Sequence, residues 1–328
     1  MNSFADGEKE HQSAFKASST SISAAGRGDG IYKEKPRTFC LPQDHADENL
    51  FHGIRSRAID FFEEYRILWH QGEGRFPSNH LCSSQVCCVN FLFPFHDKPD
   101  ALRALLLPVY PTIRRMLPVE EKSFVTFEWI GRWNYLREKE PKSGIRTRGA
   151  NCTSADACVR FEEKDGRVHT VLIEWKYTEA YEPVSLSTSS HGTDRTAIYA
   201  HLYDRADCPL NKQLITNFAD LFYEPFYQFM RQQFLAFAME TAREDGADIV
   251  SVLHIAPRRN EAFKTVTSRA LQVLGGSATE VWGKLVTRSD RFRSVASEVL
   301  FNPVNVYFEP TLAAWRSYLL ERYSFLVE

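Results

Sequence analysis

The sequence lacks the features that mark several special classes of protein. No stretch of the 328 residues approaches the ~18 consecutive apolar residues of a transmembrane helix. The N-terminus has no continuous apolar stretch of the kind that a signal peptide needs. Neither sign of charge dominates, since 40 Lys and Arg stand against 42 Asp and Glu. This balance excludes a generally polycationic binder of nucleic acid but leaves room for a local basic patch. We therefore expect a soluble, cytoplasmic protein with no membrane partner.

Cysteine patterns and common catalytic motifs are also missing. The seven cysteines are irregularly spaced and odd in number, which does not fit a secreted disulfide framework. Cys82, Cys87 and Cys88 follow His80, but they form no CxxC pair, so buried thiols are a better interpretation than a zinc site. The sequence contains no GxSxG, HExxH, GxxxxGK[ST] or GxGxxG motif. Serine hydrolases, zinc proteases and P-loop NTPases therefore have no support.

The composition that is present, 43% hydrophobic and 25% charged, is that of a globular protein. Residues 1–35 offer few large apolar groups, and we expect them to form a disordered tail. Residues 36–328 are expected to form a single α/β domain with helical additions at both ends. The expected helices span about 49–70, 97–116 with interruptions at Pro108 and Pro111, 224–243, 261–274 and 311–325. The expected strands span 126–130, 155–161, 168–175, 249–255 and 294–301.

Two acidic residues and a lysine occupy a predicted hairpin. Asp156 opens its first strand, and Glu174 and Lys176 lie near the end of its second strand. Side chains at i and i+2 share one face of a strand, and hairpin pairing can bring Asp156 beside Glu174. Two converging carboxylates repel each other unless a cation lies between them, and Mg²⁺ takes such ligands. A nearby lysine can position water or stabilise charge on phosphate, so this set suits phosphodiester hydrolysis.

The alternative is that these residues form the solvated face of a half-buried sheet. The apolar run around Glu174, VLIEW, argues against this alternative, because a charge in a buried strand is destabilising without a partner.

The same residues resemble the PD-(D/E)XK nuclease superfamily, although Ala155 stands where the superfamily's name has proline. More narrowly, the chain resembles a bacterial restriction endonuclease family within it, over about residues 50–310. The segments that carry this resemblance are SSQVCCVNFLFP at 83–94, IEWKYTEAY at 173–181 and YQFMRQQFLA at 227–236. The resemblance implies a restriction-endonuclease-like fold, with a mixed central sheet flanked by helices. It also implies Asp156 and Glu174 as ligands of Mg²⁺, for which Mn²⁺ can substitute, and Lys176 as the catalytic lysine.

Three further residues are candidates for the same site. Glu128 lies among Phe127, Trp129 and Ile130 and is a candidate third metal ligand, unless it is an edge-strand carboxylate facing water. The resemblance also supports Gln228 as a catalytic-site residue and Arg231 as a contact to nucleic acid. Their spacing puts both on one face of the predicted helix, where the alternative is a polar outer face.

A basic segment from residue 131 to residue 150 leads into Asp156. It holds six Lys and Arg against two Glu, which gives it a charge of about +4. Arg132, Arg146 and Arg148 are its candidate contacts to a phosphate backbone. The alternative is a solvated charged loop.

The sequence therefore predicts a metal-dependent endonuclease acting on DNA, of restriction or defence type. RNA as the substrate of the same fold stays open. So does a catalytically inactive module that binds nucleic acid or protein, although such modules usually lose the lysine or a carboxylate. Cutting a duplex takes two cleavages, so a homodimer is a plausible partner arrangement. A partner methyltransferase cannot be read from the sequence.

Overall fold

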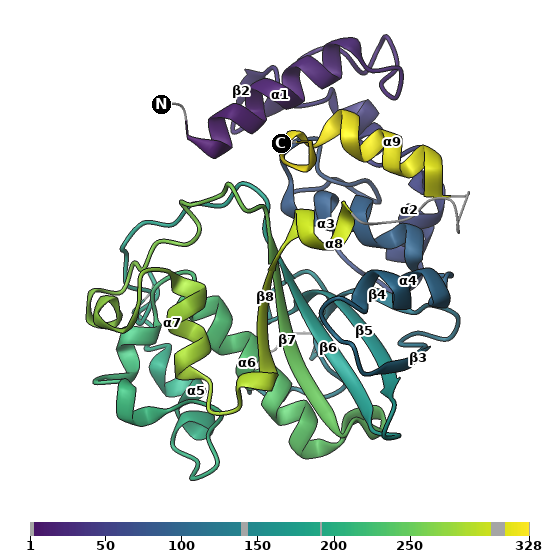
Figure 1. Ribbon diagram of the computed structural model, residues 1–328. Coiled ribbons are helices and arrows are strands. Elements are labelled where there is room, and N and C mark those ends of the chain that lie inside the picture. The colour runs from purple at the N-terminus through teal and green to yellow at the C-terminus, as the bar shows by residue number, and fades with distance from the viewer. Residues whose placement is uncertain (1–2, 139–143, 191, 303–311, 328) are drawn as a thin grey trace.

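The structure is a computed structural model that describes residues 3–138, 144–190, 192–302 and 312–327. Its centre, within these residues, is a six-stranded mixed sheet (Figure 1). The strands are β3 (Ile113–Leu117), β4 (Val125–Trp129), β5 (Ala155–Glu163), β6 (Val168–Trp175), β7 (Ile249–Ala256) and β8 (Phe292–Ala296). Their order is β3-β5-β6-β7-β8, and β4 pairs with β5 beside β3. The pairs of β5 are antiparallel, whereas β6–β7 and β7–β8 are parallel.

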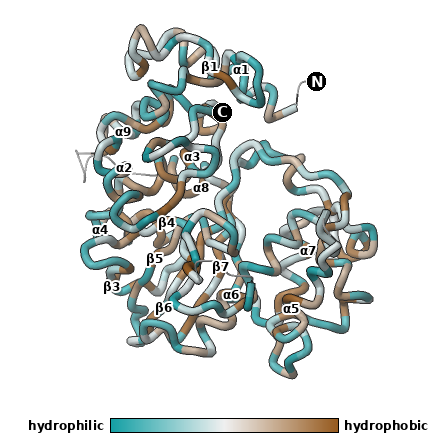
Figure 2. The backbone as a smooth tube through the Cα atoms, turned by 180° about the vertical axis from the view of Figure 1, so that it is seen from behind, coloured by the Kyte–Doolittle hydropathy of each residue, from teal (hydrophilic) through white to brown (hydrophobic). Residues whose placement is uncertain are grey.

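Helices cover both faces of the sheet, which confirms the predicted fold class (Figure 1). The α-helices are α1 (Phe4–Ser18), α2 (Arg55–Glu64), α3 (Ser84–Leu92), α4 (Pro99–Leu106), α5 (Thr196–Tyr203), α6 (Phe226–Ala242), α7 (Ala278–Leu285), α8 (Ser297–Phe301) and α9 (Ala313–Arg322). One face packs on α2, α3, α4, α8 and α9, and the other packs on α5, α6 and α7. Figure 2 shows hydrophobic segments gathered along the central strands and the helix sides that face them.

The position of β6 inside the sheet explains why its sequence is almost continuously apolar. Val171, Ile173 and Trp175 belong to the first apolar cluster, whereas Leu172 belongs to the second. Both faces are covered, so both sets of alternating side chains are buried. Glu174 shares its face with Leu172 and points to the side of α6.

The expectation of a disordered tail over residues 1–35 is wrong. The structure has α1 in this region, followed by a hairpin of β1 (Gly30–Tyr32) and β2 (Lys35–Arg37). Phe15 of α1 is 4% exposed within the first apolar cluster. Gln12 donates hydrogen bonds to Tyr177 Oη and to the Arg322 carbonyl. These partners are far away in sequence, so local composition carried no sign of them.

Other expected elements differ in extent or type. The helix expected over 97–116 ends at Leu106, and Ile113 and Met116 lie in β3, because the two prolines between them stop the helix. The strand expected over 294–301 is β8 followed directly by α8. Within 261–274 the helical part is a 3₁₀ turn, Arg269–Leu274. Among the described residues, no helix is long and apolar enough to span a bilayer.

Eight short 3₁₀ segments connect these elements in the described parts of the chain. They are Gln43–Asn49, Phe93–Phe95, Lys212–Leu214, Phe218–Leu221, Glu244–Gly246, Arg269–Leu274, Ser289–Arg291 and Ser324–Leu326.

Candidate active site

Four polar side chains form one row across four adjacent strands of the sheet. Extending the β5–β6 register by one residue from its last pair places Asp156 opposite Glu174. The β6–β7 register places Glu174 opposite His254. In β4, Phe127 pairs with Ala157 and Trp129 pairs with Ala155. Glu128 therefore lies opposite Asp156. The sheet therefore gathers three carboxylates from three strands at one level.

The predicted hairpin set comes together as its spacing indicates. The Trp175 backbone N–H donates to Asp156 Oδ2 at 2.7 Å. Lys176, which directly follows β6, donates from Nζ to Glu174 Oε1 at 2.6 Å. Glu174 and Lys176 are buried, and Asp156 is partly buried. The second oxygen of each carboxylate accepts no hydrogen bond from the described residues, so it is available to a cation.

The electrostatics of the row favour a positive partner. Burial and the neighbouring Glu174 carboxylate raise the pKa of Asp156 well above its usual range. Burial also raises the pKa of Glu128, against the hydrogen bonds it accepts. Burial acts to lower the pKa of Lys176, but the Glu174 carboxylate and the other acidic groups nearby together outweigh it and hold the pKa above its ordinary value. Lys176 is therefore a buried ammonium whose charge acts on both Glu174 and Asp156.

Glu128 is held in an unusual backbone conformation. Its φ is 49°, in the left-handed region that non-glycine residues rarely adopt, although it lies inside a strand. Its carboxylate accepts from Gln85 Nε2 at 2.7 Å and from Ser154 Oγ at 2.5 Å. Strain of this kind persists where surrounding contacts enforce it, and it is frequent at functional sites.

Helix α6 supplies the polar face opposite the row. Gln232 Nε2 donates to the Ser154 carbonyl at 2.5 Å, and Arg231 Nη1 donates to Thr153 Oγ1 at 3.2 Å. Gln228 Oε1 accepts from the Tyr181 hydroxyl at 3.1 Å. The helix thus contacts the turn that precedes Asp156.

These groups line a common cleft of about 850 Å³. Residues of the sheet, of the turn before β5 and of α6 line it, and so do the N-terminal residues Ala5, Lys9, Tyr32 and Lys33. The predicted site residues on its lining are Glu128, Asp156, Glu174, Lys176, Gln228 and Arg231.

The arginines of the basic segment lie elsewhere and bind within the protein. Arg148 pairs with Glu120 at 2.7 Å, and Arg132 pairs with Asp245 at 3.1 Å. Arg146 donates to two backbone carbonyls. None of these three arginines is on the cleft lining. Lys139 and Lys142, which belong to the same segment, lie outside the described residues.

The carboxylates of the row can provide the ligands that a magnesium ion needs. Among the described residues, no group of three or more His, Cys, Asp and Glu lies close enough to hold a metal ion. Mg²⁺ needs only one or two protein carboxylates, because water and phosphate complete its shell. Asp156 and Glu174, which lie opposite each other and repel each other, meet that requirement. Glu128 is committed to Gln85 and Ser154.

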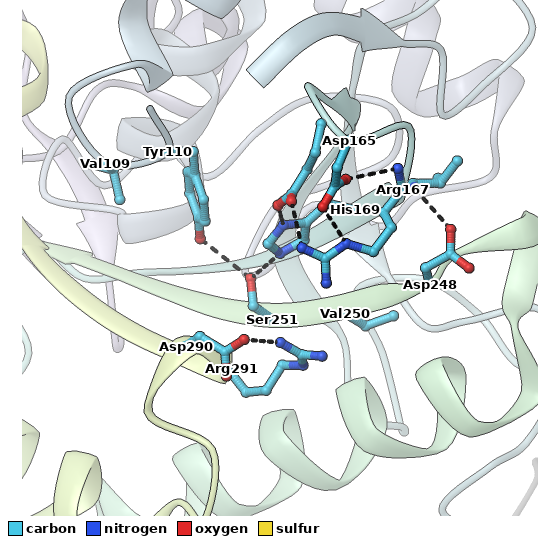
Figure 3. Close-up of polar contacts among 12 residues, drawn as sticks. Val109, Tyr110, Asp165, Arg167, His169, Asp248, Val250, Ser251, Asp290 and Arg291 are labelled. Carbon is cyan, nitrogen blue, oxygen red and sulfur yellow. Dashed lines mark hydrogen bonds and ion pairs between the residues drawn. The ribbon is translucent and has the colours of Figure 1, made fainter. Parts of the chain in front are cut away.

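A second polar cluster lies near the start of β6 (Figure 3). His169 Nδ1 lies 2.9 Å from Glu163 Oε1, and its Nε2 lies 2.8 Å from Ser251 Oγ. The order Glu-His-Ser is that of a hydrolase triad. However, Ser251 is 0% exposed, so no substrate reaches it. The Tyr110 hydroxyl lies 3.4 Å from the same Ser251 oxygen, and the cluster ties β6 to β7.

Sequence reasoning missed several residues of the site. Gln85 lies inside the segment 83–94 that carries the family resemblance, and Ser154 is two residues before Asp156. Both offered a signal. Lys9 and Lys33 offered none, because more than 120 residues separate them from the hairpin.

The comparisons with known proteins agree with this architecture. A family model described as "Restriction Endonuclease associating with ARP" matches residues 9–324. No curated protein and no solved structure gives a significant match. The match covers nearly the whole chain, including most of α1, and confirms the resemblance to a restriction endonuclease family. The chain therefore belongs to the family of restriction endonucleases associating with ARP.

Proposed function

We propose that this protein is a Mg²⁺-dependent endonuclease of the PD-(D/E)XK type that hydrolyses phosphodiester bonds of DNA, in restriction or defence. The observation that carries the proposal is the convergence of Asp156, Glu174 and Lys176 in one row that lines a cleft. Membership of a restriction endonuclease family supports DNA as the substrate.

Each residue of the row has a role that follows from its surroundings. Asp156 and Glu174 would hold the cation, which supplies positive charge to the scissile phosphate when it is bound. Lys176 would stabilise charge that develops on that phosphate, because its raised pKa keeps it an ammonium. It would therefore supply positive charge beside the scissile phosphate.

The residues around the row would orient it. Ser154 and Gln85 hold Glu128 beside Asp156. Gln228 and Arg231 line the cleft from α6, where they would contact the substrate. The basic segment remains a candidate for contacts to DNA beyond the cleft, through Arg132, Arg146 and Arg148, provided that their present internal bonds open.

The test is incubation of the purified protein with plasmid DNA, linear DNA and RNA, in Mg²⁺ or in EDTA. We expect cleavage of DNA in Mg²⁺ and none in EDTA. Asp156→Asn should abolish cleavage without unfolding the protein. Asp165→Asn is the matched control, because it neutralises a carboxylate at the far turn of the same hairpin and leaves an Asn-Gly turn.

The other outcomes are informative as well. Cleavage of RNA alone would assign the fold to an RNA nuclease. Binding of either nucleic acid without cleavage, in parent and control alike, would favour a catalytically inactive binding module. Full activity of Asp156→Asn would show that the carboxylate row does not take part in the cleavage reaction.

A further inference from the structure

The N-terminal arm, defined as residues 3–40, forms part of the wall of the cleft. Ala5 and Lys9 of α1 and Tyr32 and Lys33 of the β1–β2 hairpin line it together with the carboxylate row. In Figure 1 the arm lies across the end of the molecule that holds both termini. The arm is thus part of the same cleft as the proposed active site, although it precedes the sheet in sequence.

The arm is held firmly in this position. Lys16 is buried and donates to the carbonyls of Gly28 and Cys40 and to Asp29 Oδ1. The Tyr177 hydroxyl, one residue after Lys176, donates to Glu8 and accepts from Gln12. These contacts connect the start of the chain to the residue that follows the proposed catalytic lysine. The arm therefore presents its outer residues at a fixed distance from the site.

The two lysines of the arm reach the cleft from different elements. Lys33 stands at the hairpin tip, where Lys33 and Glu34 have φ of 49° and 63°, as in the tight type I′ turn. Its Nζ lies 5.4 Å from the centre of the Tyr32 ring. The Lys9 side chain is 37% exposed and pairs with Asp6 at 3.1 Å, a partner that solvent screens. Both lysines lower the pKa of His80, which lies on the same cleft, so their charges act at a common point.

Charges of both signs line the cleft. Four carboxylates, Glu128, Asp156, Glu174 and Glu179, share the lining with Lys176 and Arg231. The carboxylates would repel the phosphates of an approaching DNA backbone. Lys9 and Lys33 add positive charge to the same lining, where they can attract phosphates and release their counterions.

We propose that Lys9 and Lys33 bind the phosphate backbone of DNA in the cleft, and that the N-terminal arm is a DNA-binding element of this enzyme. The inference rests on the proposed nuclease function and names the surface by which that site holds its substrate. The contacts are to phosphate, so they contribute affinity without sequence preference.

The experiment measures binding of a fluorescent DNA duplex to the full-length protein by anisotropy, in EDTA, over a range of salt concentrations. The variant is Lys9→Ala combined with Lys33→Asn, since asparagine tolerates the left-handed backbone at that position. We expect weaker binding and a slope of log K against log salt that is shallower by about 2. Lys35→Ala is the matched control on the same hairpin, because Lys35 is exposed and is not on the cleft lining.

Cleavage assays in Mg²⁺ then separate binding from chemistry. We expect the double variant to raise KM for DNA and to leave kcat at saturating DNA unchanged. A salt slope equal to that of the parent would overturn the inference, and so would a parent protein that does not bind the duplex. A shallower slope in a protein that never cleaves DNA would support the arm as a binding element while refuting the nuclease proposal.

Discussion

At the scale of single residues, Lys176 combines burial with a fixed charge. Its ammonium is 2.6 Å from Glu174 Oε1 and opens into the cleft beside Asp156. A buried ion pair contributes little net stability, because the cost of removing both charges from water offsets their attraction. Such a pair therefore suits a chemical role better than a stabilising one. Under the proposed function, the pair would place a cation beside the scissile phosphate.

We expect Lys176→Ala to lower kcat by ~10²-fold or more and to change DNA affinity little. Lys176→Arg should not restore the rate, because the planar guanidinium is larger and has a different geometry. Single-turnover cleavage in Mg²⁺ measures this. Because Glu174 is left buried without its cation in the Ala variant, thermal melting must first show that it is folded.

Lys164→Ala is the control for this experiment, since Lys164 lies at the turn of the same hairpin and its exposed Nζ donates to the Pro111 backbone carbonyl. If Lys176→Ala cleaved as fast as Lys164→Ala, the lysine would be a structural partner of Glu174 and no more.

At the scale of elements, His80 joins the N-terminal arm to the loop before α3. Its Nδ1 accepts from the Cys82 N–H at 3.1 Å, and the rings of Tyr32 and Phe39 pack on it at 4.7 and 5.0 Å. Burial, aided by Lys9 and Lys33, lowers its pKa to about 4. Protonation of His80 would remove the acceptor of the Cys82 N–H. The docked arm therefore requires the neutral imidazole.

The protein should therefore lose stability as the pH falls from about 6.5 to about 4. In this window the unfolded chain binds a proton at His80 that the folded chain does not, so acid favours unfolding. The free energy of unfolding, from urea titrations at pH 7 and pH 4.5, should fall less in His80→Gln than in the parent. The difference should be up to about 3 kcal/mol, at 1.36 kcal/mol for each pH unit.

His52→Gln is the control for this titration, because His52 is exposed and also lies in the N-terminal half. If lowering the pH reduced the free energy of unfolding of His80→Gln as much as that of His52→Gln, groups other than His80 would cause the acid sensitivity.

At the scale of the whole molecule, metal binding can be detected through the stability of the fold as well as through activity. The formal net charge of the chain is only -2, so a cation is attracted by the local row rather than by the protein as a whole. A ligand that binds the folded state alone raises the free energy of unfolding, by about 2.7 kcal/mol at one hundred times its Kd.

We expect the melting temperature to rise with Mn²⁺ concentration in the parent and in Asp165→Asn, and to rise much less in Asp156→Asn. Differential scanning fluorimetry with and without EDTA measures this with no need for activity. Without metal, Asp156→Asn should melt no lower than the parent. Burial raises the pKa of Asp156, so its ionisation costs stability above the unfolded pKa, and a neutral amide avoids that cost. An equal Mn²⁺ shift in Asp156→Asn would place the metal elsewhere.

The sequence by itself determined the parts of this protein that depend on local pattern. Two strand-like runs and the Asp-Gly turn between them fixed β5 and β6 and their pairing, and with them the meeting of Asp156, Glu174 and Lys176. Such a hairpin joins residues that are near in sequence, so spacing alone predicts its contacts. The family assignment followed from ordered segments along the same chain.

The tertiary structure alone decided what comes from distant parts of the chain. It brought Glu128 and Gln85 to the row, engaged Arg148 with Glu120, and turned the expected disordered tail into a wall of the cleft. The N-terminal arm buries few apolar groups of its own. It is ordered by partners such as Tyr177 and Arg322, and the energy of those contacts appears only when the whole chain has folded.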